Sequence, residues 1–252
     1  MTTQANILEI FPSIQGEGKY AGVPQVFVRF FECNMHCVWC DTPASIGDTT
    51  RNYKEMSLED VFRQVKEIWQ GCHPSSPRPS GATPDFANQG AGAHSVSLTG
   101  GEPLLQKDFI KALLPLLKRE GMRTYLETNG VLPDELQDII DDIDMIAMDI
   151  KLPSSTQCKP YWDEHARFLE IGKKKDIFIK AVISSQTDKE DIVKAVEVIS
   201  RVNPATEVIL QPNTFDLKNG VMPKCLEYQR YCLARLPNTR ILPQMHKFMK
   251  LR

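Results

Sequence analysis

The sequence predicts an α/β protein whose parallel sheet forms a partial barrel of the (β/α)6 type. Short apolar runs, several rich in β-branched residues, alternate with stretches in which apolar residues recur at helical spacing. Polar and glycine-containing motifs follow several of these runs, as expected where the carboxyl ends of parallel strands form a site. About six units are too few to close an eight-fold barrel, so we expect an open sheet.

Seven strands are predicted from short apolar segments. The clearest is residues 177–183, which is rich in β-branched side chains. The other six, in chain order, are residues 25–30, 95–98, 124–126, 144–150, 207–210 and 239–242.

Four helices are predicted between these strands. Ser57 is a favourable N-cap for the first helix. Pro115 is expected to kink or interrupt the second. Thr187 and Glu190 have the spacing of a capping box, which is expected to open the third helix. The helical segments are residues 57–70, residues 106–120, a segment that begins at Thr187 and carries Ile192, Val196 and Ile199, and residues 222–236.

Residues 71–94 differ in composition from the rest of the chain. They contain four prolines, several glycines and serines, and few apolar residues, which is typical of an exposed loop. A surface insertion is favoured over a functional lid. We therefore predict a single domain over residues 1–252 with a loop insertion at residues 71–94.

Charge and hydropathy exclude two classes of partner. The chain has 30 Lys and Arg residues against 32 Asp and Glu residues, too even a balance for a non-specific nucleic-acid binder. No run approaches the roughly 18 to 20 apolar residues of a membrane span. Because the first residues lack the layout of a secretory signal, we expect a cytoplasmic protein without disulfides.

Three of the seven cysteines lie within eight residues. Cys33, Cys37 and Cys40 have C-x3-C-x2-C spacing, so three thiolates on one loop can bind one metal centre. On a 4Fe–4S cluster they leave one iron without a protein ligand, and catalytic metal sites keep such an open position. The alternatives are a zinc site completed by His36 or His73 and a chance grouping of buried cysteines. We interpret the other four as packing residues: Cys72, Cys158, Cys225 and Cys232.

A glycine motif, Thr99-Gly-Gly-Glu-Pro103, follows the next predicted strand. Together with the cysteine motif it resembles the radical S-adenosylmethionine enzymes. The resemblance implies a partial barrel of the radical S-adenosylmethionine kind and a 4Fe–4S cluster on the three cysteines. It also implies S-adenosylmethionine as cofactor, with its amino and carboxylate groups on the open iron and its methionyl group beside the glycines.

A narrower resemblance is to the 7-carboxy-7-deazaguanine synthase family. It is carried by Ile14-Gln-Gly-Glu-Gly18, Gly22-Val-Pro24, Phe27-Val-Arg29, Cys40-Asp-Thr42 and Gln244-Met-His-Lys247. The resemblance implies a carbon–nitrogen lyase that converts 6-carboxy-5,6,7,8-tetrahydropterin to 7-carboxy-7-deazaguanine with loss of ammonia, a step towards queuosine and related deazapurines. It further implies that Mg²⁺ assists and that S-adenosylmethionine is regenerated in each turnover.

The same resemblance assigns roles to individual residues. Arg29 suits bidentate capture of the substrate carboxylate, with a solvent-facing strand arginine as the alternative. The Thr42 hydroxyl is expected on Mg²⁺, which prefers oxygen ligands. No acid or base is assigned, since the cofactor supplies the radical chemistry. The predicted substrate-binding residues are Ile14, Gln15, Gly16, Glu17, Arg29, Thr99 and His246. The predicted cofactor contacts are Trp39, Cys40, Asp41, Gly101, Glu127, Asp149, Ile150, Lys151, Gln211, Pro212, Asn213 and Thr214.

Two motifs depart from the family pattern, and one of these departures keeps another function open. Glu32 precedes the first cysteine where the family usually has glycine, and Met148-Asp-Ile-Lys151 stands where many members carry Ser-Pro-Lys. The second departure leaves a glycyl-radical-enzyme activase, which acts on a protein, as one rival. A non-catalytic, zinc-stabilised binding module is the other. The partners that the resemblance implies are the small-molecule pterin, a flavodoxin-like reductant and a second copy in a homodimer.

Overall fold

A nine-stranded sheet runs through the part of the chain that the computed structural model describes, residues 4–47, 52–72 and 92–251. The strand order is β3-β1-β2-β4-β5-β6-β7-β8-β9, and every pair from β2 to β9 is parallel. The strands are β1 (Gln4–Ile14), β2 (Pro24–Phe30), β3 (Lys54–Ser57), β4 (Ser95–Gly100), β5 (Thr124–Thr128), β6 (Met145–Asp149), β7 (Asp176–Ile183), β8 (Glu207–Pro212) and β9 (Thr239–Ile241).

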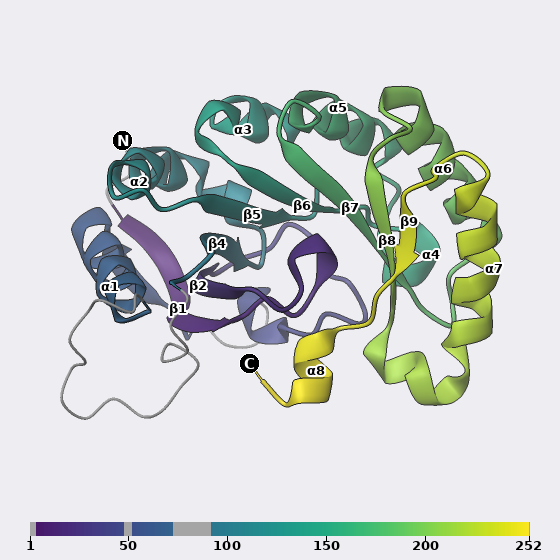
Figure 1. The fold of residues 1–252 in the computed structure, drawn as a ribbon, viewed down its shortest axis with the longest axis horizontal. Helices are drawn as coiled ribbons and strands as arrows, with labels where there is room; N and C mark the ends of the chain where they lie inside the picture. The colour runs from purple at the N-terminus through teal and green to yellow at the C-terminus, as the bar shows by residue number, and fades with distance from the viewer. Residues whose placement is uncertain (1–3, 48–51, 73–91, 252) are drawn as a thin grey trace.

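Helices cover the outer side of the curved sheet, as Figure 1 shows, while α8 lies on the inner, open side. Each βα unit places its helix on this outer side because a parallel strand requires a crossover connection. The helices are α1 (Leu58–Gly71), α2 (Lys107–Arg119), α3 (Pro133–Gln137), α4 (Pro153–Thr156), α5 (Trp162–Gly172), α6 (Lys189–Val202), α7 (Val221–Leu233) and α8 (Met245–Met249).

The predicted fold class is confirmed, because the sheet is mostly parallel and does not close. All seven predicted strands are present, as β2 and β4 to β9. Two further strands, β1 and β3, pair antiparallel at the edge and were not predicted. The pairing register of β1 shifts between Ile7 and Glu9, a bulge that breaks the alternation of buried and exposed side chains. Because of this irregular pattern, a search for alternating apolar and polar residues does not detect β1.

Successive side chains of the central strands point to opposite faces of the sheet. Leu126, Ile146 and Ile179 face the helices and belong to the large apolar core. Tyr125 and Phe178 face inward and, with three neighbours, form a smaller cluster inside the curve of the sheet. This inner cluster forms the apolar floor of the cavity described below.

The predicted helices are present, with two corrections. Ser57 caps α1 as predicted, accepting a hydrogen bond from the Asp60 amide. Pro115 does not interrupt α2, because it lies on the exposed face, where water can solvate the carbonyl left without a partner. Thr187 does not cap α6, which begins at Lys189. The Thr187 hydroxyl instead accepts from the Ser184 amide at 2.8 Å.

Most of the predicted insertion lies outside the described residues, which omit 73–91. Its role, and the single-domain organisation over residues 1–252, stay predictions. Among the described helices, none combines the length and apolar character needed to cross a membrane.

Candidate active site

A polar cavity of about 410 Å³ opens at the carboxyl ends of the parallel strands. Its lining comes from the end of β1, from the loops after β2, β4, β5, β6 and β8, and from the segment around α8. Parallel strands gather these ends at one edge of the sheet, as the sequence predicted from the positions of the motifs. Of the predicted site residues, all line the cavity except Ile150 and Pro212. Those two side chains are buried away from it.

The three clustered cysteines follow β2 on a loop that is held in place on both sides. The Cys40 amide donates to the Cys37 carbonyl at 3.0 Å. The Trp39 indole donates to the Ser155 carbonyl at 2.6 Å, which fixes the loop against α4. Burial raises the pKa of the Cys33 thiol to about 11 and that of Cys37 to about 12. Thiols this buried become thiolates when a metal centre replaces their protons.

The spacing of the sulfur atoms bears on which metal centre fits. A single tetrahedral zinc ion, with Zn–S bonds of about 2.3 Å, draws its sulfurs to about 3.8 Å from one another. Within the described part of the chain, one group places its ligand atoms within 4.8 Å of each other, and it contains Glu17, Asp41 and His246 but none of the cysteines. The three cysteine sulfurs therefore do not all lie within 4.8 Å of one another, and three cysteines on one cavity wall fit a cluster that carries each on a different iron.

Two glycines bring the loop after β4 against the cysteine loop. Gly100 has φ +135°, and a Cβ there would collide with the Phe30 carbonyl. A Cβ on Gly101 would collide with the Glu32 carbonyl. The Glu102 amide donates to the same carbonyl at 2.8 Å. The glycines are therefore required for backbone-to-backbone contact between two loops that both line the cavity.

Glu102 was not singled out in the sequence, yet it joins the loops after β4 and β5. Its buried carboxyl group accepts from the amides of Leu104 and Asn129 and from the Thr128 hydroxyl, at 2.8–3.1 Å. Burial raises its pKa to about 7, opposed by these three donors. Behind this loop, His165 is fully buried, and its Nε2 lies 3.1 Å from the Asn129 carbonyl. Burial lowers the pKa of His165 to about 4.

Glu127 lies among the predicted substrate residues, although the sequence assigned it to the cofactor. Its carboxylate accepts from Gln15 Nε2 at 2.6 Å and from the Thr99 hydroxyl at 2.9 Å. Gln15 is itself only 3% exposed. Glu127 thus holds two predicted substrate residues from different strand ends in one hydrogen-bonded group.

Arg29 points into the cavity, so the solvent-facing alternative is wrong. Its side chain is 18% exposed, and its Nε donates to Glu9 Oε1 at 2.9 Å. Its guanidinium lies 5.6 Å from the centre of the Phe11 ring, and its Nη1 lies 3.4 Å from the Thr42 hydroxyl. Strand β1, which the sequence analysis missed, supplies both Glu9 and Phe11 and so orients the arginine.

A chain of ion pairs crosses the cavity from the loop after β6 to the loop after β1. Lys151 Nζ lies 2.7 Å from Asp149 and 5.2 Å from the centre of the Trp39 ring. Lys180, from β7, lies 3.5 Å from Asp149 and forms an ion pair with Glu17. Burial alone would raise the pKa of Glu17, but the charge of Lys180 and hydrogen bonds from Gln244 and Lys180 lower it to about 2.

Two buried acceptors at the cavity have no hydrogen-bond partner among the described residues. They are Asp149 Oδ1 and Gln211 Oε1. Both residues line the cavity, and buried acceptors in proteins are nearly always satisfied. Such atoms fit a bound ligand that carries several N–H or O–H donors, as the amino group, ribose and adenine of S-adenosylmethionine do.

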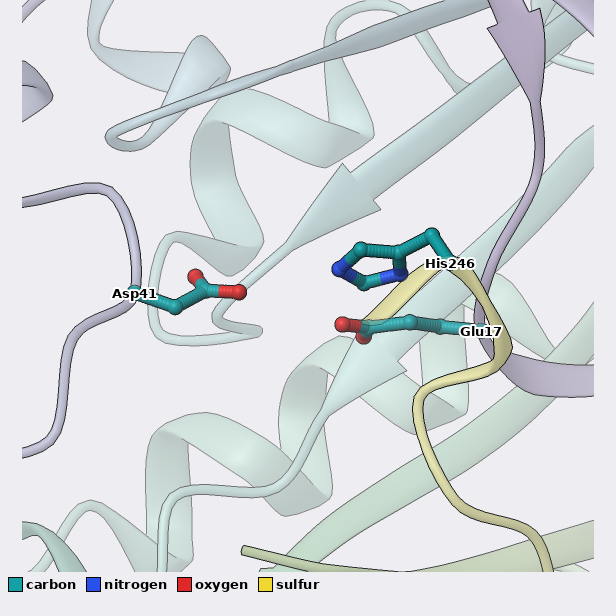
Figure 2. A group of neighbouring side chains, drawn as sticks. All are labelled: Glu17, Asp41 and His246. Atoms are coloured by element: carbon teal, nitrogen blue, oxygen red, sulfur yellow. The ribbon is translucent and has the colours of Figure 1, made fainter. Parts of the chain in front are cut away.

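Glu17, Asp41 and His246 point toward one another from three separate segments (Figure 2). Gln244 donates to both carboxylates, Lys180 pairs with Glu17, and Lys247 lies 3.6 Å from Asp41. Because donors and cations already surround these carboxylates, we assign no metal to this group. It forms a hydrogen-bonded corner of the cavity.

Comparison with known proteins agrees with this architecture. A profile of the Radical SAM superfamily matches residues 85–213. A 7-carboxy-7-deazaguanine synthase of Geobacter sulfurreducens is 39% identical over 249 residues, which cover 97% of this chain and 97% of that protein. A second, from Methanopyrus kandleri, is 34% identical and covers 98% of this chain and 94% of that protein.

Solved structures share the fold. The crystal structure of QueE from Escherichia coli has a TM-score of 0.62 at 22% identity and covers 97% of this chain and 96% of its own. A structure of TYW1 with a lysine–pyruvate adduct bound has a TM-score of 0.57 at 17% identity, over 83% of this chain and 73% of its own.

These matches favour the radical-enzyme interpretation over both rivals, the activase and the zinc-stabilised module. The predicted 4Fe–4S cluster and S-adenosylmethionine follow from the family, and the cysteine loop, the close-packed glycines and the buried acceptors fit them. The chain is a radical S-adenosylmethionine enzyme and belongs to the 7-carboxy-7-deazaguanine synthase family.

Proposed function

We propose that this enzyme converts 6-carboxy-5,6,7,8-tetrahydropterin to 7-carboxy-7-deazaguanine with loss of ammonia, within deazapurine synthesis. One observation carries the proposal: a partly buried arginine, two carboxylates and a carboxamide share a single cavity with the three-cysteine loop. The pterin has a carboxylate at one end and a donor–acceptor heterocycle at the other. The cavity offers a cation for the first and acceptors and donors for the second.

The substrate carboxylate is assigned to Arg29. Its guanidinium can donate two parallel hydrogen bonds to a carboxylate, the strongest geometry for such a pair. Glu9 and Phe11 hold the side chain on the cavity wall, which supports this role. Thr42, whose hydroxyl is 3.4 Å from Arg29 Nη1, is assigned to Mg²⁺ between protein and substrate.

The pterin ring is assigned to the opposite end of the cavity. The ionised Glu17 accepts from the ring amino and amide groups, and Gln15 and Thr99, tied together by Glu127, bind its polar edge. His246 packs against Gly16, where a Cβ would collide with its ring, and so covers the backbone from Ile14 to Glu17. The apolar floor of Tyr125 and Phe178 excludes water beneath the ring.

The cofactor is assigned to the side of the cavity that carries the cysteines. Cys33, Cys37 and Cys40 would hold the cluster, which together with S-adenosylmethionine would supply the radical chemistry. Trp39, Asp41 and Gly101 border this side. The polar groups of Asp149, Lys151, Gln211, Asn213 and Thr214 bind the cofactor, and Ile150 and Pro212 act through their backbones only.

A flavodoxin-like protein is proposed as the reductant, and a homodimer and a cytoplasmic location are part of the same proposal. Val38 supports the first point, because it lies between Cys37 and Cys40 and is 69% exposed. An exposed side chain between two of the three cysteines leaves this part of the loop accessible to an electron-donor protein. The resemblance to the family supports the other two points.

The test is a product assay. Anaerobic protein with a reconstituted cluster is mixed with reductant, S-adenosylmethionine, Mg²⁺ and the carboxytetrahydropterin, and the deazaguanine is measured by mass spectrometry. We expect product in large excess over S-adenosylmethionine consumed, since the cofactor is regenerated. A protein that carries the cluster and forms no deazaguanine contradicts the proposal.

A further inference from the structure

Gln244 connects three segments of the cavity wall that are far apart in the sequence. Its Nε2 donates to Glu17 Oε1 at 2.5 Å and to Asp41 Oδ2 at 3.1 Å. Its Oε1 accepts from the Thr214 hydroxyl at 2.5 Å. The side chain is 8% exposed and immediately precedes α8. A carboxamide has two N–H groups and a carbonyl, and here each group serves a different segment.

The position demands an uncharged donor. Ligand atoms of Glu17, Asp41 and His246 lie within 4.8 Å of one another, so two carboxylates approach closely (Figure 2). An amide between them donates one hydrogen bond to each carboxylate without adding a charge. A carboxylate in its place would offer no donor and would repel both.

The segment that follows Gln244 is joined to the same wall by its backbone. The Met245 amide donates to the Gly16 carbonyl at 2.8 Å, and the Leu251 amide donates to the His246 carbonyl at 2.9 Å. We call residues 244–251 the C-terminal strap. Its side chains at positions 244, 246, 247 and 251 line the cavity, next to the backbone of Gly16 and Glu17.

We propose that Gln244 is a positioning residue for the pterin reaction, because it fixes the Glu17 carboxylate and holds the C-terminal strap over the substrate. The inference rests on the proposed function and goes beyond it. Lys180 holds one oxygen of Glu17 and Gln244 holds the other. With both oxygens held, the carboxylate keeps one orientation, and the pterin meets acceptors that are already aligned.

Two variants of the full-length protein, each with its cluster, separate the effect of the hydrogen bonds that Gln244 donates from the effect of its size. Gln244→Glu keeps the size of the side chain and the acceptor for Thr214 but replaces the donor with a third carboxylate. Gln244→Leu removes all three hydrogen bonds. We expect the KM for the pterin to rise at least thirtyfold in Gln244→Glu and about tenfold in Gln244→Leu. We expect kcat to fall less than threefold and the visible spectrum of the cluster to stay unchanged.

Gln229→Leu is the matched control. Gln229, on α7, donates to the Thr239 carbonyl at 3.3 Å and does not line the cavity. We expect the KM of Gln229→Leu for the pterin to lie within twofold of the parent value. A Gln244→Glu variant with the KM of the parent protein overturns the inference, because the carboxamide then acts through shape alone.

Hydrogen exchange without pterin distinguishes failure of the inference from failure of the proposed function. In both Gln244 variants we expect faster exchange in peptides that contain residues 245–251, since the strap loses its anchor. Unchanged exchange overturns the inference, whatever the substrate. Faster exchange in a protein that turns over no pterin overturns the proposed function and supports the anchoring role.

Discussion

The two walls of the cavity are built in different ways. The proposed cofactor wall consists of the cysteine loop and the loops after β4, β5, β6 and β8, and each contributes a short motif that is contiguous in the chain. The substrate wall consists of residues 14–18, Arg29 and the C-terminal strap. Its key contacts join Gln15 to Glu127, Glu17 to Lys180 and Gln244 to Glu17. Short motifs therefore indicate residues of both walls, whereas the contacts that hold the substrate wall depend on long-range pairing.

The largest effect is expected on the cofactor wall. Cys37→Ala removes a proposed cluster ligand, so we expect loss of bound iron, of the visible absorbance and of all product formation. Far-ultraviolet circular dichroism is expected to stay unchanged, because the loop has no regular structure. Cys72→Ala is the control, because Cys72 belongs to the apolar core and does not line the cavity, and full iron content and activity are expected there. Equal losses in both variants would contradict the division of the cysteines into three ligands and four packing residues.

On the substrate wall, Arg29→Ala is expected to weaken binding without affecting the cluster. Loss of a partly buried guanidinium that is proposed to bind the substrate carboxylate is expected to cost about 3 kcal/mol, or about a hundredfold in KM for the pterin. Arg29→Lys is expected to recover part of this loss, since it keeps the charge but not the fork. Steady-state kinetics and the visible spectrum provide the measurements. Disappearance of the cluster in Arg29→Ala would mean that the two walls are not independent.

The contact between the two loops of the cofactor wall is tested with Gly101→Ala. The added Cβ collides with the Glu32 carbonyl, which the backbone cannot avoid by a side-chain rotation. We expect about 3 kcal/mol of destabilisation and weaker binding of S-adenosylmethionine. Urea unfolding and equilibrium dialysis measure these effects. Gly71→Ala is the control, because a Cβ at this position, the end of α1, meets nothing within 4 Å. We expect its urea midpoint to be unchanged or slightly raised.

The pH dependence of stability tests the support behind the cofactor wall. His165 is buried with a folded pKa of about 4, below its ordinary value of 6.5, so the unfolded chain binds the proton more tightly. Stability is therefore lost as pH falls from about 6.5 towards 4. The loss between pH 7 and pH 5 is about 2 kcal/mol.

We expect His165→Gln to remove this loss, as measured by urea midpoints at both pH values under anaerobic conditions. Glu102, whose folded pKa is raised to about 7, changes stability in the opposite sense over this range. The difference between parent and variant isolates the histidine. If the stability of His165→Gln changes with pH as that of the parent protein does, other groups cause the pH dependence.

The smallest effect is expected at Glu32, which departs from the family pattern. Its φ of +84° lies in the left-handed region, where a side chain with a Cβ is strained and glycine is not. Glu32→Gly is expected to raise the free energy of unfolding by about 1 kcal/mol, measured by urea denaturation. Glu32→Ala keeps the Cβ and is expected to leave it unchanged. If Glu32→Ala is also stabilised, the gain comes from removing the Glu32 charge and not from relieving backbone strain.

Much of the fold could be predicted because it repeats a local pattern. The strands that became β2 and β4 to β9 are short apolar runs that need no partner to be recognised. Strand β1 escaped because its bulge breaks the alternation. Thr187 had the local spacing of a helix cap, but its hydroxyl accepts a hydrogen bond from the Ser184 amide instead. Local rules fail where a neighbouring segment takes the same group.

The sequence by itself determined the cofactor chemistry and the family. The cysteine spacing, the glycine motif and the family motifs each lie within a few consecutive residues, so they can be recognised without the fold. Only the tertiary structure decided how the substrate wall is held. Glu9 orients Arg29, Lys180 ionises Glu17, and Gln244 closes the corner from the far end of the chain. Glu9 and Lys180 lie in no recognised motif, and the motif that contains Gln244 does not show what its side chain binds, since a lysine or glutamine acquires such a role only from the side chain that folding places opposite it.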